Sequence, residues 1–153
     1  MATVVYIYDK YRLKNFNGAA INMELPGGNG IKAALVTSAY VPNQNTDEFW
    51  STPQASEVTG GSYTAGGNVL ANGIVTLDAA GLVTVDFADP AAWAQDALGF
   101  TNARRVIIYH DDGVAAASSK LIAFSADFGV DRNNVDGPFS IVINLAGLIT
   151  SPR

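Results

Sequence analysis

Alternation of apolar and polar positions along the second half of the chain predicts β-strands. Within residues 82–87, Val83, Val85 and Phe87 share one face, a spacing typical of a strand with one buried side. Residues 106–109 instead form a continuous β-branched and aromatic run, which predicts a strand that is buried on both faces.

Two further runs alternate in the same way, and each places four apolar side chains on one side of a predicted strand. These side chains are Ile122, Phe124, Ala126 and Phe128 in residues 121–128, and Phe139, Ile141, Ile143 and Leu145 in residues 139–145. Turn-forming residues separate the runs at positions 111–113, 131–137 and 147. Strands at this spacing indicate an antiparallel β architecture.

The first half of the chain is less regular. Residues 6–16 predict a short helix, although the β-branched residues Val4, Val5 and Ile7 favour a strand at its beginning. Residues 31–37 predict a strand that follows a turn at Pro26-Gly27-Gly28.

Loop 39–56 is long for a connection in a compact domain, and loops of this length are usually functional or disordered. Within it, Thr46 is placed to cap one helical turn that runs through Trp50. Residues 89–97, with Pro90 at the first helical position, predict one or two further helical turns.

A two-residue hairpin is predicted at Asn72-Gly73, between strands at residues 69–71 and 74–77. The predicted elements together describe one mainly β domain over residues 1–153. We expect an antiparallel β-sandwich or a barrel-like domain with one or two short helices.

Composition narrows the classes of function. The chain has no cysteine, which excludes disulfides, cysteine–zinc sites and thiol catalysis. Nine Lys and Arg stand against fourteen Asp and Glu, a net charge of −5 without a basic face, which argues against a nucleic-acid partner. No apolar stretch approaches the roughly 20 residues of a membrane span, and the N-terminus lacks the order of a secretory signal. We therefore expect synthesis in a cytoplasm and no membrane partner.

No set of residues forms a recognisable catalytic pattern. His110, with Asp111 and Asp112 after it, stands where a strand ends, and a general base would also need a placed nucleophile. Residues 131–137 supply oxygens of the kind that calcium binds, without the spacing of an EF-hand. The glycine-rich residues 27–30 precede a strand, unlike a phosphate-binding loop. We expect no enzyme activity, no metal and no cofactor.

Short segments in a fixed order along nearly the whole chain carry a resemblance to one family. They include YDKY (8–11), IKAALVTS (31–38), YVPNQNT (40–46), EVTG (57–60), YTAGG (63–67), LAN (70–72), residues 83–87, Trp93, residues 105–109 with Asp111-Asp112, LIAF (121–124), DFG (127–129) and FSI (139–141). The ordered set resembles bacteriophage virion structural proteins, most closely head decoration (cement) proteins.

The resemblance implies a non-enzymatic protein at the capsid surface of the virion. Its partners would be the major capsid protein and further copies of itself, in a homotrimer that stabilises the head. A tail or fibre structural protein is the first alternative. A carbohydrate-binding module that uses Trp50, Trp93 or Tyr63 is the second.

Residues 1–16 and loop 39–56 are the predicted regions of contact with the capsid or a neighbouring subunit. Aromatic anchors mixed with polar groups are typical of interfaces. The candidate contact residues are Tyr6, Tyr8, Tyr11, Arg12, Phe49 and Trp50. The alternative is that the tyrosines pack on the sheet and that the loop covers one end of it.

Overall fold

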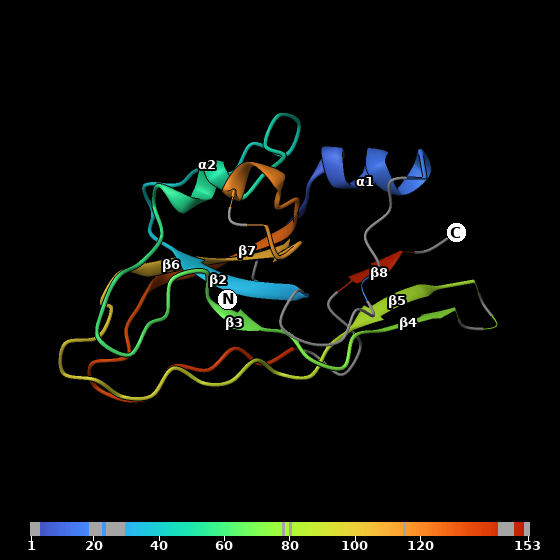
Figure 1. The fold of residues 1–153 in the computed structure, drawn as a ribbon. Coiled ribbons are helices and arrows are strands. Elements are labelled where there is room, and N and C mark those ends of the chain that lie inside the picture. The colour runs from blue at the N-terminus through green and yellow to red at the C-terminus, as the bar shows by residue number, and fades with distance from the viewer. Residues whose placement is uncertain are drawn as a thin grey trace.

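Two antiparallel β-sheets form the framework of the protein in a computed structural model (Figure 1). The structure describes residues 4–18, 23, 30–77, 79, 81–114, 116–143 and 149–151. Five strands in the order β1-β7-β6-β2-β3 make the larger sheet, and three in the order β4-β5-β8 make the smaller one. The predicted mainly β, sandwich-like fold with two short helices is confirmed.

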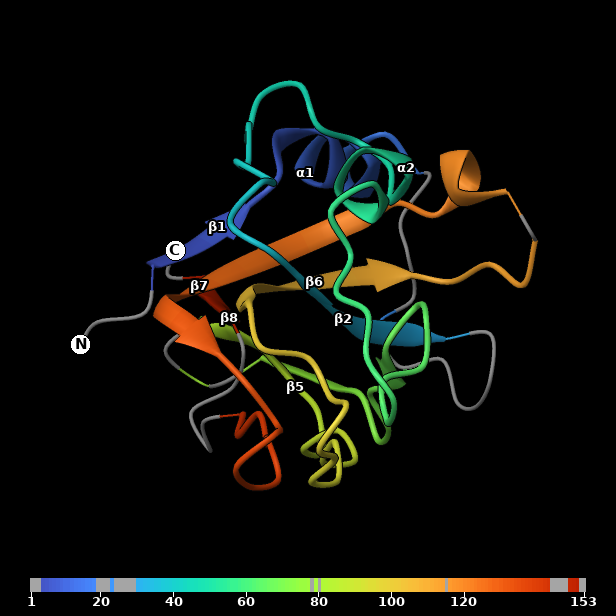
Figure 2. The same cartoon turned by 90° about the vertical axis from the view of Figure 1, so that its left-hand side faces the viewer.

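The strands of the larger sheet are β1 (Val4–Ile7), β2 (Ile31–Val36), β3 (Asn68–Val69), β6 (Ala103–His110) and β7 (Ile122–Arg132). Those of the smaller sheet are β4 (Ile74–Leu77), β5 (Val83–Asp86) and β8 (Ile149–Ser151). The helices α1 (Asp9–Phe16) and α2 (Ser51–Gln54) and a 3₁₀-helix (Ala117–Ser119) lie on one side of the larger sheet, as Figures 1 and 2 show. Extended segments from residues 88–102 and 133–143 lie on its other side.

The core lies on both faces of the central strands. β6 pairs with β2 on one side and with β7 on the other, and residues 106–109 are between 0 and 4 % exposed. An antiparallel sheet often keeps one face toward solvent, but here helices cover one face and extended segments cover the other. The predicted strand with two buried faces is therefore confirmed.

Residues 139–143 alternate in burial as predicted but do not form a regular strand. Phe139 and Ile141 are half-buried, Ile143 is buried, and the two residues between them are exposed. Phe139 makes an isolated antiparallel bridge to Trp93 in place of a ladder. An alternating sequence predicts which side chains face the core. A regular strand also needs a neighbouring strand with which its backbone can form a series of hydrogen bonds. Leu145 and Gly147 lie outside the described residues.

The hairpin predicted at Asn72-Gly73 is wrong. β3 pairs with β2 and β4 pairs with β5, so this dipeptide carries the chain from the larger sheet to the smaller one. Asn72 has a φ of 54°, the left-handed conformation that makes Asn-Gly common in tight turns. Here the same backbone conformation occurs where the chain passes from one sheet to the other.

The helical predictions hold only in part. Residues 6–16 contain both competing elements, because β1 ends at Ile7 before α1 begins. The turn capped by Thr46 is wrong, since α2 begins at Ser51. The turns predicted over residues 89–97 are also wrong, because the extended chain there buries Trp93, and tertiary packing overrides local propensity. The turn predicted at residues 26–28 lies outside the described residues.

Candidate interaction surface

Three of the six predicted contact residues lie in the core. Tyr8, Tyr11 and Trp50 are 0, 7 and 2 % exposed. Trp50 stacks on Tyr109 with ring centroids 4.7 Å apart, and Tyr11 meets Phe124 edge-on at 5.1 Å. Side chains that are buried in the single chain are not available to anchor a partner. These three side chains therefore pack against the sheet, as the alternative prediction states.

Tyr6, Arg12 and Phe49 keep exposed surface and remain predicted contact residues. The side chain of Arg12 projects from α1 and is 63 % exposed, with a guanidinium nitrogen 3.4 Å from the carboxylate of Asp9. Phe49 is half-buried, and the ammonium group of Lys14 lies 4.8 Å from the centroid of its ring. Lys14 therefore lies over one face of the Phe49 ring.

Loop 39–56 is tied to the rest of the fold by buried tyrosines. The hydroxyls of Tyr8 and Tyr40 lie 2.7 Å apart, and Tyr40 donates a hydrogen bond of 2.8 Å to the carboxylate of Asp47. Arg105 donates to the carbonyl oxygen of Tyr40 at 2.6 Å. Burial raises the pKa of both tyrosines, so they stay protonated near neutral pH. This long loop covers the sheet as part of the fold.

The aromatic residues considered for carbohydrate binding are also buried. Trp50, Trp93 and Tyr63 are 2, 2 and 9 % exposed. Tyr63 stacks on Trp93 with ring centroids 6.1 Å apart, and both rings meet Phe100 edge-on. A sugar-binding platform needs an open ring face, which these three side chains do not present.

His110 ends β6 at the turn predicted from the sequence. The neighbouring Asp111 forms ion pairs with Lys32 and Lys120 at 2.6 and 3.0 Å. Burial alone would raise the pKa of Asp111, but hydrogen bonds from the two lysines and from the amide of Gly113 outweigh it and hold the pKa below its usual value. The carboxylate links β2, β6 and the segment before β7, which is a structural role.

The residues that the structure describes contain no group of three or more His, Asp or Glu side chains that could hold a metal ion. None of the helices within them is long and apolar enough to cross a membrane.

The hairpin of β4 and β5 presents an apolar face. Antiparallel pairing places Val75 opposite Val85 and Leu77 opposite Val83, so that four apolar side chains share one side. Val75, Leu77 and Val83 are 42, 70 and 38 % exposed. We call these four residues the hairpin face.

Burial on this side of β5 decreases along the strand, from the larger sheet outward. Phe87 is 5 % exposed and Val85 packs partly against the core, whereas Val83 is 38 % exposed. Figure 1 shows the hairpin extending away from the larger sheet. The sequence predicts these three side chains to be buried together, and the structure buries only the inner end of the row.

Sequence reasoning missed the hairpin face because it treated residues 74–77 only as a strand. A signal is present in the sequence: three of these four residues are apolar, so both sides of the strand carry apolar side chains. A strand with one solvated side should alternate instead. Ile74 breaks the alternation, so this strand carries more apolar surface than one covered side accounts for.

No family model, curated protein or solved structure matches this chain.

Proposed function

We propose that this chain is a non-enzymatic structural protein of a bacteriophage virion, a capsid decoration protein on the outer surface of the head. The hairpin face is the observation that supports it, because contiguous exposed apolar surface commonly marks a contact with another protein. The resemblance of the ordered segments supplies the partners, which are the major capsid protein and neighbouring copies in a homotrimer.

Stabilisation of the head would come from many modest contacts. Full burial of a Val or Leu side chain contributes about 1.5–3 kcal/mol, and partly exposed side chains contribute less. A lattice repeats such a contact many times, so the copies act together. Charged residues make up only 15 % of the chain, which keeps the number of charges to be desolvated small.

Cryo-EM of particles of the phage that encodes this protein tests the location. Decorated particles should show density for the two-sheet domain on the outer capsid surface, at repeated lattice positions. Density confined to the tail would overturn the head assignment in favour of a tail or fibre structural protein. Particles without any such density would overturn the virion role.

A pair of variants on one strand tests the contact. Leu77→Glu places a charge on the hairpin face, whereas Thr76→Glu places the same charge on the opposite side of β4. Leu77→Glu should weaken capsid binding about tenfold or more, because a buried unpaired charge costs more than 1.4 kcal/mol. Thr76→Glu should bind as the wild type does.

Circular dichroism checks that both variants fold. Equal capsid occupancy for the two folded variants would show that the hairpin face is not the contact. The exposed Arg12 then becomes the next residue to test, through Arg12→Glu.

A further inference from the structure

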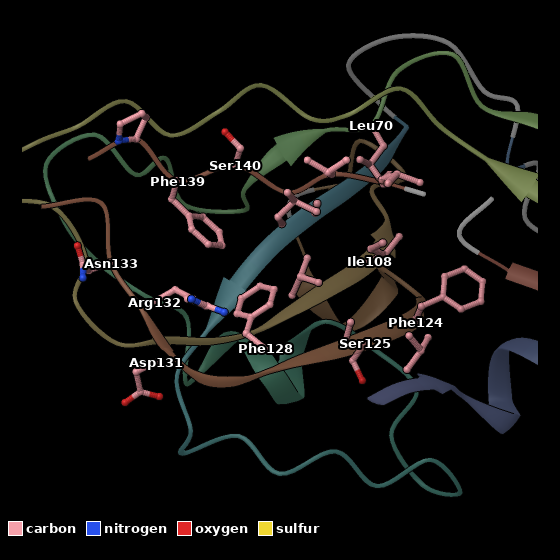
Figure 3. Close-up of a pocket in the computed structure, with 18 residues that line it drawn as sticks. Leu70, Ile108, Phe124, Ser125, Phe128, Asp131, Arg132, Asn133, Phe139 and Ser140 are labelled. Atoms are coloured by element: carbon pink, nitrogen blue, oxygen red, sulfur yellow. The ribbon is translucent and has the colours of Figure 1, made fainter. Parts of the chain in front are cut away.

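A hollow of about 830 Å³ lies between the larger sheet and residues 138–143, which we call the strap (Figure 3). Sites for small molecules usually measure about 300–1,000 Å³. The buried side chains of its floor are apolar and between 1 and 4 % exposed. They are Ala33, Leu70, Val106, Ile108 and Phe124.

The strap is fixed near both of its ends. Phe139 and Trp93 exchange two backbone hydrogen bonds of 2.9 Å, and the amide of Ile143 donates to the carboxylate of Asp89 at 2.7 Å. The ring of Phe139 meets the ring of Phe128 on β7 edge-to-face, with centroids 5.5 Å apart. These contacts hold the strap in place over the sheet, on one side of the hollow.

Arg132 brings a positive charge to one end of the hollow. In Figure 3 its guanidinium lies beside the ring of Phe128, whereas the carboxylate of Asp131 points away from the cavity. Asp131 lies 3.9 Å from a different cation, Arg104. Within the described part of the chain, Arg132 has no ion pair.

These features define the chemistry of an occupant. The floor of the hollow is apolar and one end carries a cation, so the hollow suits a molecule with one apolar part and one anionic group. The apolar floor favours a hydrocarbon chain. The planar guanidinium of Arg132 favours a carboxylate, which it can bind through two parallel hydrogen bonds.

We propose that the hollow binds a free amphiphilic carboxylate, with its hydrocarbon chain under the strap and its carboxylate on Arg132. The site uses none of the residues of the hairpin face. Ligand binding and capsid binding can therefore fail separately.

Calorimetric titration of the full chain with decanoate, below its micelle concentration, tests the proposal. Saturable binding of one molecule per chain is expected. Arg132→Gln should weaken decanoate about tenfold and leave 1-decanol, which lacks the carboxylate, unchanged. Arg12→Gln, a matched change of an exposed arginine on α1, should leave both affinities unchanged.

Ala126→Phe tests whether the ligand lies in the hollow. The larger side chain fills space beside the sheet and should abolish binding of both decanoate and 1-decanol. Amide chemical-shift changes induced by decanoate in the wild type give a second readout that does not depend on that variant folding. They should centre on Ala126, Phe128 and Ile141. No saturable binding, shifts centred on the hairpin face, or an unchanged decanoate affinity in Arg132→Gln would overturn the proposal.

Discussion

Strands of similar composition have opposite surroundings in the two sheets. Ile107 and Ile108 of β6 are 0 and 4 % exposed, whereas Ile74 and Leu77 of β4 are 53 and 70 % exposed. β6 has a strand on each side and a covering layer on each face, while the hairpin of β4 and β5 extends away from those layers. Side-chain type therefore determines that a strand forms, and the surrounding layers determine whether it is buried.

Raising the pH should affect the larger sheet most strongly, because it carries the buried tyrosines. Burial raises the pKa of Tyr8, Tyr40, Tyr63 and Tyr109 above the ordinary value of about 10. Each contributes stability that is fully present below that value and lost as the pH rises through the folded-state pKa, since the unfolded chain ionises first. For Tyr40, Tyr63 and Tyr109, whose pKa values are raised furthest, the loss at about pH 11 should be about 1.4 kcal/mol each.

Urea unfolding at neutral and alkaline pH measures this loss. In Tyr63→Phe, the free energy of unfolding should fall less steeply with rising pH, because one buried hydroxyl no longer ionises on unfolding. A stability that stays constant up to about pH 11 would contradict the burial of these hydroxyls.

Truncation of one aromatic residue in each environment sharpens the comparison. Phe124→Ala removes a side chain that is 1 % exposed and should lower the free energy of unfolding by about 3–5 kcal/mol. Phe16→Ala makes the same chemical change at a position that is 87 % exposed, and should change it by less than about 0.5 kcal/mol. Thermal and urea unfolding of both variants measure the difference. Similar losses would show that burial in the single chain does not set the stability.

The sequence predicted the central strands because their patterns are local and strong. Residues 31–36 and 106–109 are strands as expected, and the run from Ile122 to Phe128 lies within β7. Which strands pair with each other was harder to predict from the sequence. The Asn-Gly dipeptide at 72–73 lies at a bend of the chain, but nothing local says that β4 will pair with β5 instead of β3.

The site was harder to predict because it depends on contacts that are distant in sequence. Trp50 stacks on Tyr109, far along the chain, so an aromatic residue in a long loop became core. Arg132 and the strap acquire their common hollow only when the chain folds back over the sheet. A periodic pattern records which face is apolar, but it does not record what covers that face.

The larger sheet should also respond to loss of one half-buried carboxylate, that of Asp127. Asp127 contacts Arg104 at 2.7 Å and Arg105 at 2.9 Å. Asp127→Asn removes the anion that both guanidinium groups share, leaving Arg104 only the longer contact with Asp131, and should lower the free energy of unfolding by about 1–3 kcal/mol. Asp136→Asn, at an exposed turn, should have an effect within about 0.5 kcal/mol. Equal effects in urea unfolding would show that these ion pairs do not stabilise the sheet.

The smallest change in stability is expected on the hairpin face. Leu77→Ser removes an apolar side chain that the single chain leaves 70 % exposed, so the free energy of unfolding should change by less than about 0.5 kcal/mol. Self-association, measured by light scattering at increasing protein concentration, should weaken if copies meet through this face. Thr76→Ser, on the opposite side of β4, should leave the mass unchanged. A trimer that persists in Leu77→Ser would place the subunit contact elsewhere. A wild-type chain that stays monomeric would remove the trimer in solution and leave the capsid lattice as the surface on which copies meet.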